Sequence, residues 1–271
     1  MKKKVVLITG ASSGIGMATA SVLNERGYQV YAAARQVEKM KSLRQAGIHV
    51  LAMDVTKEEA MASAIQTINR EAGTIDVLVN NAGYGSYGAL EDVPISEAKY
   101  QFEVNVFGLA RLIQLVLPAM RAQRAGRIIN VSSIGGRIGE PHGAWYHATK
   151  FAVEGLSDSL RMELKQFGIE VVVIQPGAIQ TEWNRIAREN LVKVSGGTVY
   201  QDLVGKHAQM LENADRRGSQ PLVIAKTIER AIEDRHPKTR YAAGAGAKAI
   251  LFIRKILSDR AFDKLMLSQM K

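Results

Sequence analysis

A glycine-rich turn between an apolar run and an amphipathic run constrains the fold of this chain most. Val5 to Ile8 form a short apolar segment typical of a buried parallel strand, and apolar residues recur at helical spacing from Met17 to Arg26. The turn between them reads Thr9-Gly10-Ala11-Ser12-Ser13-Gly14-Ile15-Gly16. A second strand from Gln29 to Ala34 completes a strand-turn-helix-strand unit, in which a pyrophosphate binds backbone N–H groups at the helix N-terminus. The sequence therefore predicts a dinucleotide-binding site.

The glycines of this turn have separate tasks. Gly10 permits a tight turn, whereas Gly14 and Gly16 let the backbone and a phosphate approach each other closely. Their spacing, G-x-x-x-G-x-G, differs from the G-x-G-x-x-G of most dinucleotide-binding folds. A turn with a purely structural role is the alternative.

Apolar runs and helix-like runs alternate along the rest of the chain. Further strands are predicted over His49 to Ala52, Ile75 to Val79, Arg127 to Val131, Glu170 to Gln175 and Arg240 to Ala243. Long helices are predicted over Ser96 to Gln123, kinked at Pro118, and over Tyr146 to Phe167. This alternation predicts an α/β fold, a Rossmann-type doubly wound parallel sheet of about seven strands flanked by helices. A single domain is expected over residues 1–271.

One tyrosine, Tyr146, is followed one helical turn later by a lysine, Lys150. Positions i and i+4 share a helix face, so the ammonium group can lie beside the phenol and favour its ionised form. A free tyrosine, with a pKa near ~10, is a poor acid or base at neutral pH, so a cationic neighbour would suit proton transfer. A surface tyrosine beside a solvated lysine is the alternative.

Six separated motifs connect the chain with a known family. It carries, in order, Thr9 to Gly16, Asn80-Asn81-Ala82-Gly83, Asn105, Ser133, Tyr146 with Lys150, and Pro176-Gly177 with Thr181. In their order and spacing these motifs resemble the single-domain branch of the short-chain dehydrogenases/reductases, from about Lys4 to Trp183. The resemblance implies an enzyme that interconverts a ketone or aldehyde and an alcohol by hydride transfer from or to a nicotinamide cofactor.

By this resemblance, four residues carry catalysis: Asn105, Ser133, Tyr146 and Lys150. Ser133 would hydrogen-bond the carbonyl oxygen, and Tyr146 would act as general acid or base on it. Lys150 would lower the Tyr146 pKa and hold the ribose, and Asn105 would hold a water molecule in a proton relay. Ser132 is the rival serine, but the 13-residue offset of Ser133 from Tyr146 matches the family.

The resemblance also assigns the cofactor contacts. Asp54 is expected near the adenine amino group and Thr181 near the nicotinamide carboxamide, with a turn residue or a helix cap as the alternative for each. The expected set is Gly10, Ser12, Ser13, Gly14, Ile15, Gly16, Arg35, Asp54, Val55, Asn81, Ala82, Gly83, Tyr146, Lys150, Pro176, Gly177, Ile179 and Thr181.

The end of the second strand indicates which nicotinamide cofactor binds. An NAD site usually has Asp or Glu here for the ribose 2′-hydroxyl, whereas an arginine can pair with the 2′-phosphate of NADP. By the resemblance, Ala34 occupies the acidic position, and Arg35 follows it. NADP(H) is therefore favoured over NAD(H), with an exposed cation at a helix start as the alternative for Arg35.

The substrate is expected to be bulky and hydrophobic. Residues of about 180–219 occupy the family's variable substrate loop, and plausible apolar walls are Trp145, Trp183, Ile186 and Tyr200, although core packing would explain each. The regions Tyr84 to Val93 and Asn105 to Gly136 resemble hydroxysteroid and retinol dehydrogenases and acyl-dihydroxyacetone-phosphate reductase, which implies a steroid-, retinoid- or acyl-ketone-like substrate. Alternatives are a non-catalytic NADP-sensing or scaffold protein and a membrane-surface lipid-modifying reductase.

No metal site is predicted. His142 and His147 flank the expected site without ligand spacing around them, so they are expected to be structural or to line the substrate wall. The chain has no cysteine, which excludes disulfides and thiolate metal sites.

The formal charge of +10 is concentrated at the two ends, with +3 from Lys2 to Lys4 and +7 from Arg235 to Lys271. A basic helical segment of about 247–270 carries the apolar residues Ile250, Phe252, Ile253, Ile256, Leu257, Phe262 and Leu265. Packing of this face over the protein's own pocket or a partner subunit is favoured over contact with an anionic membrane surface. Nucleic-acid binding is not expected, because no such motif accompanies the charge.

The oligomeric state, the ligand and the cellular location are predicted from the resemblance and the sequence. By the resemblance, the helices matching Ser96 to Gln123 and Tyr146 to Phe167 pair in a homodimer or homotetramer, and the ligand is a small carbonyl or alcohol. A cytoplasmic protein is expected, since no signal-peptide core follows Met1 to Lys4 and no apolar run approaches the ~18 residues that span a bilayer.

Overall fold

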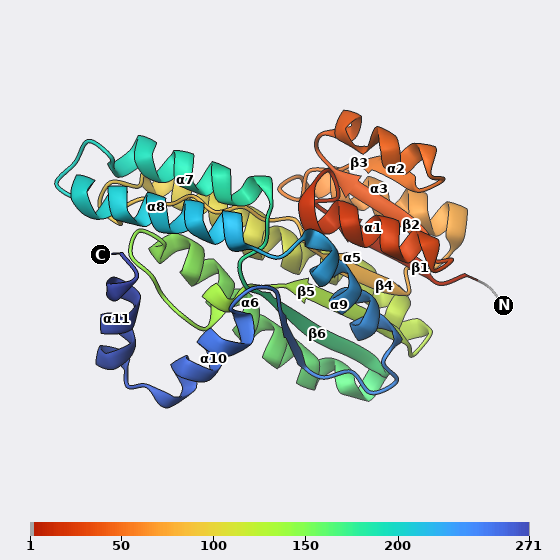
Figure 1. Cartoon of the computed structure of the whole chain (residues 1–271). Coiled ribbons are helices and arrows are strands. Elements are labelled where there is room, and N and C mark those ends of the chain that lie inside the picture. Colours follow the sequence, from red (N-terminus) through yellow and green to blue (C-terminus); the bar gives the residue numbers. More distant parts are fainter. Residues whose placement is uncertain (1–2, 271) are drawn as a thin grey trace.

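A seven-stranded, wholly parallel sheet forms the centre of the computed structural model, which describes residues 3–270 (Figure 1). Its strands are β1 (Val5–Thr9), β2 (Gln29–Ala34), β3 (His49–Ala52), β4 (Val77–Asn80), β5 (Gly126–Val131), β6 (Ile169–Pro176) and β7 (Arg240–Ala243). They lie in the order β3-β2-β1-β4-β5-β6-β7. The order reverses between β1 and β4, and ligands bind beyond the carboxyl ends of strands at such a switch point. The predicted doubly wound α/β fold is confirmed.

Each face of the sheet is buried under helices because side chains alternate along a strand. On β1, Val5 and Leu7 enter one apolar core, and Val6 and Ile8 enter the other. The first core lies under α3 (Glu58–Ala72), α5 (Gly108–Ala122) and α6 (Ala144–Leu164). The second lies under α1 (Gly14–Glu25), α2 (Lys41–Gln45) and α9 (Pro221–Glu233). Short 3₁₀ turns lie at Val37–Met40, Ile134–Gly136 and Lys165–Phe167.

The helix predicted over Ser96 to Gln123 has an interruption that the sequence did not reveal. It consists of α4 (Ile95–Phe102), a π-helical turn at Glu103–Phe107, and α5. Pro118 lies inside α5, which continues to Ala122. The departure from α-helical hydrogen bonding therefore lies at the turn that carries Asn105.

The stretch Ile95–Ala122 is also long and apolar enough to cross a membrane, by length and composition alone. The expectation that no run reaches this threshold was wrong. The physical reason is visible in the fold, because the apolar side of α5 forms part of the core. Its buried residues there include Leu109, Leu112, Ile113, Val116 and Met120.

Two helical pairs lie away from the layers that cover the sheet. The first is α7 (Glu182–Ser195) with α8 (Gln201–Arg217), two long helices that pack side by side (Figure 1). The second is α10 (Ala247–Ile256) with α11 (Asp259–Ser268). The predicted single helical segment of about 247–270 is thus divided, because Leu257 adopts extended backbone angles and Ser258 begins the next helix. Lys2 and Lys271, part of the predicted basic ends, lie outside the described residues.

One face of this C-terminal pair packs onto the protein itself. Phe262 and Met266 join Ile138 in a small apolar cluster, against which Ile134, Ile250, Ile253 and Leu257 pack. Four of the seven predicted apolar residues, Ile250, Ile253, Leu257 and Phe262, therefore pack onto the protein as favoured. Phe252, Ile256 and Leu267 remain exposed on the other side of the pair.

Candidate active site

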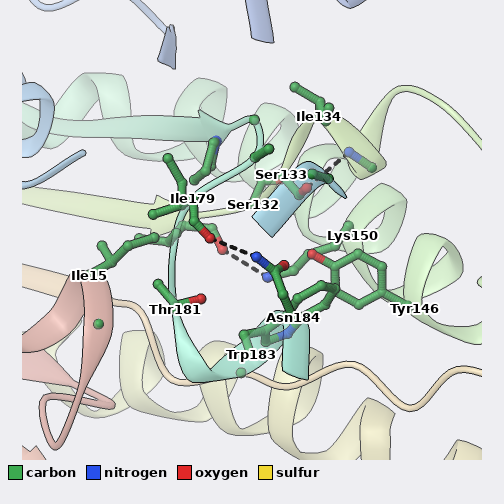
Figure 2. A pocket seen from close by; sticks show the side chains of 18 of the residues that line it. Ile15, Ser132, Ser133, Ile134, Tyr146, Lys150, Ile179, Thr181, Trp183 and Asn184 are labelled. Atoms are coloured by element: carbon green, nitrogen blue, oxygen red, sulfur yellow. Dashed lines mark hydrogen bonds between the residues drawn. The ribbon is translucent and has the colours of Figure 1, made fainter. Parts of the chain in front are cut away.

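A cavity lies beyond the carboxyl ends of β1, β4, β5 and β6, and Figure 2 shows its lining. Predicted residues that line it are Gly10, Ser13, Gly14, Ile15, Asn81, Ala82, Gly83, Ser133, Tyr146, Lys150, Pro176, Gly177, Ile179 and Thr181. Ser12, Gly16, Arg35, Asp54, Val55 and Asn105 do not line it. Residues from every separated motif except Asn105 thus meet around one cavity.

The turn after β1 is held by hydrogen bonds with Asn81 and Ala82, which directly follow β4. The Thr9 hydroxyl accepts hydrogen bonds from the backbone N–H groups of Asn81 and Ala82, at 3.0 and 2.9 Å. In return, the Asn81 amide donates to the Thr9 and Gly10 carbonyls, at 2.9 and 3.2 Å. Because these bonds cross from one strand end to the next, they fix the turn at the switch point of the sheet.

The turn has the shape that a dinucleotide needs. Gly10 and Gly14 have φ angles of +65° and +53°, a region that favours glycine. A Cβ on Gly16 would lie 2.4 Å from the Gly10 carbonyl oxygen, so only glycine allows this approach. Ser13, the N-cap of α1, makes no side-chain cap hydrogen bond, which leaves the first N–H groups of the helix for another acceptor. These residues fit the pyrophosphate of a dinucleotide.

At the predicted adenosine end, two residues already have partners within the chain. Arg35 is exposed just after β2, and its Nη1 donates to the Tyr100 hydroxyl at 2.9 Å. The Asp54 carboxylate accepts from the Thr56 backbone N–H and hydroxyl, both at 2.9 Å. That pattern is a hydrogen-bonded turn, the alternative considered for Asp54. Thr181 is the N-cap of α7 without a side-chain cap hydrogen bond, so capping does not explain it.

Tyr146 and Lys150 lie on the first turns of α6 and point into the cavity (Figure 2). Both side chains belong to buried residues, with 7% and 8% of their surface exposed. Burial raises the pKa of Tyr146 to about 12, with the nearby Ser133 side chain opposing the rise. Burial also lowers the pKa of Lys150 to about 8, against the opposite influence of Glu154. At neutral pH the phenol is therefore protonated, and the lysine still carries most of its charge.

The expected lowering of the Tyr146 pKa by Lys150 is not found. The Lys150 ammonium lies 5.9 Å from the centre of the Tyr146 ring and donates to the Val131 carbonyl at 3.0 Å. The i, i+4 spacing places both groups in the same buried site, where loss of solvation is the largest influence on the Tyr146 pKa and raises it.

The two serines after β5 both line the cavity but differ in their contacts. The Ser133 hydroxyl accepts from the Gly135 backbone N–H at 3.0 Å and is close enough to Tyr146 to affect its pKa. The Ser132 hydroxyl is buried and has no hydrogen-bond partner among residues 3–270. Of the two, Ser133 has the contacts expected of a group that works with Tyr146.

Asn105 lies behind the cavity wall, 2% exposed. Its amide oxygen accepts from the Tyr84 backbone N–H at 3.0 Å, and its nitrogen donates to the Tyr84 carbonyl and the Thr149 hydroxyl, at 2.9 and 3.1 Å. A Cβ on Gly83 would lie 3.1 Å from the Asn105 oxygen and 3.7 Å from the Lys150 nitrogen. The Asn105 oxygen and the Lys150 nitrogen therefore both face the side of Gly83 where a side chain would lie.

The substrate side of the cavity is apolar and comes from elements far apart in the chain. Its apolar residues include Tyr87, Ile134, Ile138, Trp183, Leu211 and Ala214. Of the predicted wall residues only Trp183 lines the cavity, whereas Trp145, Ile186 and Tyr200 do not. Trp145 packs against Phe102, Ile186 is exposed, and the Tyr200 hydroxyl donates to Glu91 at 2.6 Å.

Three residues with polar groups line the cavity but were not predicted from the sequence, namely Tyr87, Glu140 and Asn184. Asn184 donates to the Ile179 carbonyl at 2.8 Å and to Asp215 at 2.9 Å, and the second bond joins α7 to α8. His147 lines the cavity, and His142 pairs with His207 of α8, with 3.0 Å between their Nδ1 atoms. Within the described part of the chain, no group of three acidic, His or Cys side chains is arranged to hold a metal ion.

Comparisons with known proteins agree with this geometry. The family model for short chain dehydrogenase matches residues 4–191. A 3-ketodihydrosphingosine reductase of Bacteroides thetaiotaomicron is 37% identical over 245 residues, 90% of this chain and 89% of that protein. An NADPH-dependent 3-dehydrocapnine reductase of Ornithobacterium rhinotracheale is 31% identical over 283 residues, 99% of this chain and 98% of that protein.

Solved structures show the same fold. A short-chain dehydrogenase from Streptomyces avermitilis superposes with a TM-score of 0.83 at 32% identity, covering 98% of this chain and 96% of that one. A short chain dehydrogenase/reductase from Burkholderia phymatum in complex with NAD superposes with a TM-score of 0.80 at 26% identity, covering 94% and 92%. The chain therefore belongs to the short-chain dehydrogenase/reductase family of oxidoreductases.

Proposed function

We propose that the protein is an NADP(H)-dependent reductase that interconverts a bulky hydrophobic ketone or aldehyde and the corresponding alcohol, with Tyr146 as general acid. One observation carries the proposal: Tyr146, Lys150 and Ser133 line the same cavity as the glycine turn on one side and an apolar wall on the other. A non-catalytic NADP-sensing or scaffold protein would not need a protonated phenol, a serine and a lysine at such a cavity.

The residues of the chain have distinct tasks in this reaction. When bound, the nicotinamide cofactor supplies the hydride that reaches the carbonyl carbon. Ser133 donates a hydrogen bond to the carbonyl oxygen, and Tyr146 transfers its proton to that oxygen as negative charge develops. Its raised pKa keeps the phenol protonated until then. Lys150 is near enough to support the transfer by its charge and to hold the ribose hydroxyls, and Asn105 hydrogen-bonds the backbone of Tyr84, the residue after Gly83.

We assign the pyrophosphate to the Gly10–Gly16 turn and the 2′-phosphate of NADP(H) to Arg35. Arg35 is exposed at the end of β2, where Ala34 offers no carboxylate to the ribose. A guanidinium group binds phosphate through paired, charge-assisted hydrogen bonds. The NADPH dependence named for the 3-dehydrocapnine reductase relative supports this preference.

The substrate is proposed to be a ketone on a large apolar frame. Support comes from the apolar side chains around Trp183 and from the two relatives, whose names specify a 3-keto and a 3-dehydro compound. The test is a panel of steroid, retinoid, long-chain and short-chain carbonyl compounds, assayed by loss of NADPH absorbance. Reduction of the large compounds at higher kcat/KM than the short ones is expected. A protein that binds NADPH and reduces none of them would contradict the proposal.

A homodimer or homotetramer is part of the proposal. Phe107, Phe151 and Met162 are exposed by 54%, 48% and 69% on the stretch before α5 and on α6, the helices expected to pair. Apolar side chains so placed favour burial against a second copy. Light scattering at micromolar concentration is expected to give at least the dimer mass, and a monomer would contradict pairing.

One observation favours a second candidate, a reductase that works at a membrane surface. On α10, Lys248, Phe252, Lys255 and Ile256 are all exposed and lie along one face. Apolar side chains flanked by lysines suit the interface of an anionic bilayer. Co-sedimentation with anionic vesicles, lost on replacing Phe252 and Ile256 by glutamate, is the expected result if this candidate holds. No sedimentation of the unmodified protein would exclude it.

A further inference from the structure

A buried carboxylate, that of Glu154, lies on α6 one helical turn after Lys150. Positions i and i+4 share a helix face, so the two side chains leave α6 on the same side. The Glu154 side chain is 4% exposed and is not part of the cavity lining. A Cβ on Gly136 would lie 2.9 Å from Glu154 Cγ and 3.0 Å from the Lys150 carbonyl oxygen. Glu154 thus packs against the 3₁₀ turn that follows Ser133.

Donors from three other elements hold the Glu154 carboxylate in place. Oε1 accepts a hydrogen bond from the Gln175 side-chain amide of β6 at 2.9 Å. Oε2 accepts from Arg240 Nε of β7 at 2.8 Å and lies 3.5 Å from Nε of Arg137, the residue after the 3₁₀ turn. Both oxygens therefore have partners, and the position of this buried charge is fixed from β6 and β7.

Lys150 has no ionic partner of its own. Its ammonium donates to the Val131 carbonyl at 3.0 Å, and within residues 3–270 no carboxylate forms an ion pair with it. A buried ammonium without a compensating charge tends to lose its proton. Glu154 opposes this loss, since its carboxylate raises the pKa of Lys150 against the larger effect of burial. A carboxylate one turn away favours the charge through space and leaves the other N–H groups of the ammonium available to a ligand.

We infer that Glu154 is a positioning residue of the proposed reductase, whose carboxylate keeps the Lys150 ammonium charged beside Tyr146 at the pH at which the enzyme works. The other polar groups around the ammonium do not supply this effect. Tyr146 and the two serines after β5 are uncharged at neutral pH, and the positive charges of Arg137 and Arg240 disfavour a third one nearby. This inference rests on the proposed function and adds a residue outside the cavity to it.

The first test is the pH dependence of kcat/KM for the best substrate of the carbonyl panel, with NADPH as reductant. In the wild type, kcat/KM should decline as the pH rises past about 8, because Lys150 then loses its proton. Glu154→Gln keeps the shape of the side chain and removes its charge, so the decline should begin at a pH lower by about one unit or more. Glu154→Asp keeps the charge and should return the decline toward that of the wild type.

Asp158 provides a matched control on the same helix and the same arginine. Its carboxylate accepts from Arg240 Nη2 at 2.7 Å, but it is 37% exposed and lies two turns beyond Lys150. Asp158→Asn should therefore leave the decline close to that of the wild type. If Glu154→Gln does not fold, Arg137→Gln takes its place. It removes a half-exposed cation beside Glu154, so the decline should move to higher pH, and an unchanged decline would contradict the inference.

A second measurement needs no substrate. Acetic anhydride reacts with the neutral amine of a lysine and not with the ammonium, so the yield of acetylated Lys150 against pH reports the charge of this residue directly. Mass spectrometry of the peptide measures the yield, and the exposed Lys165 after α6 is the reference within the same chain. In Glu154→Gln, Lys150 should become reactive at lower pH than in the wild type.

The two measurements separate the possible outcomes. An unchanged labelling profile in Glu154→Gln, or an equal shift in Asp158→Asn, would overturn the inference and leave Glu154 a structural residue. A shift in labelling without a shift in kcat/KM would also overturn it, because the charge of Lys150 would then not limit the reaction. If the wild type reduced no carbonyl compound, the proposed function would fail, whereas a labelling shift would still show that Glu154 controls the charge of Lys150.

Discussion

The cofactor side and the substrate side of the cavity depend on different physical requirements. On the cofactor side, the turn after β1 depends on backbone conformation, since Gly10 and Gly14 have positive φ and Gly16 has no room for a Cβ. On the substrate side, Trp183, Leu211 and their neighbours contribute apolar surface from α7 and α8. Backbone geometry of the first kind admits one residue type, whereas apolar surface of the second kind has many solutions of similar volume. The residues of the cofactor side are therefore restricted by what any dinucleotide needs, whereas the residues of the substrate side can differ with the substrate.

The largest effect is expected at the boundary between the two sides, where Tyr146→Phe removes the phenol hydroxyl. Turnover should fall by roughly 10² to 10⁴, the range for losing a positioned general acid, while NADPH affinity stays close to that of the wild type. Single-turnover kinetics and fluorescence titration with NADPH measure the two quantities. Tyr200→Phe is the control, because its hydroxyl lies outside the cavity and bonds Glu91 instead. Near-normal turnover of Tyr146→Phe would remove this residue from its proposed task.

Next in size is the choice of cofactor. Hydrogen bonds to charged groups are worth about 1.5 to 3 kcal/mol, so Arg35→Leu should lower kcat/KM for NADPH about tenfold or more. Adding Ala34→Asp supplies a carboxylate that repels phosphate and accepts from a ribose hydroxyl, so the double variant should prefer NADH.

Tyr100→Phe is the matched control for this series. It removes the hydroxyl that Arg35 contacts in this structure while keeping the guanidinium group, so the preference for NADPH should remain. If the wild type uses NADH as well as NADPH, or the double variant keeps the wild-type preference, Arg35 does not bind the phosphate.

A third change tests the rigidity of the cofactor side directly. Gly16→Ala would place a Cβ 2.4 Å from the Gly10 oxygen and 2.6 Å from the Asn81 amide nitrogen. Overpacking of this kind costs about 1 to 3 kcal/mol, so both the free energy of unfolding and the NADPH affinity should fall. Denaturant unfolding with and without NADPH measures both. Unchanged affinity would mean that the turn can move aside.

The smallest effect, of opposite sign, is expected on the substrate side. Gly205 lies inside α8, where no heavy atom would lie within 4 Å of an added Cβ. Gly205→Ala should therefore stabilise the protein by about 0.5 to 1 kcal/mol, because glycine loses more conformational freedom in a helix than alanine. If Gly205→Ala lowered the free energy of unfolding as much as Gly16→Ala does, the two sides would not differ in their tolerance of an added Cβ.

The same contrast explains what could be predicted from the sequence. All seven strands and the residues around the glycine turn were predictable, because alternation of apolar runs and a need for glycine both leave a pattern in the sequence. The residues of the substrate wall could not be predicted, because Leu211 and Ala214 have the same helical spacing as residues of an ordinary apolar core. The pKa of Tyr146 was misjudged, because the spacing to Lys150 reveals geometry and not the loss of solvation that raises it.

The π-helical turn at Glu103–Phe107 restricts where residues can be inserted into or deleted from the chain. Such a turn holds one residue more than an α-helical turn, and each residue of an α-helix advances the rotation by about 100°. Deleting one codon here would restore regular α-helix and rotate everything on one side of the deletion by that angle relative to the other. Either Asn105 would lose its bonds to Tyr84 and Thr149, or Leu112 and Val116 would leave the core. Insertions and deletions should therefore be tolerated in the loop between α7 and α8 but not in this turn.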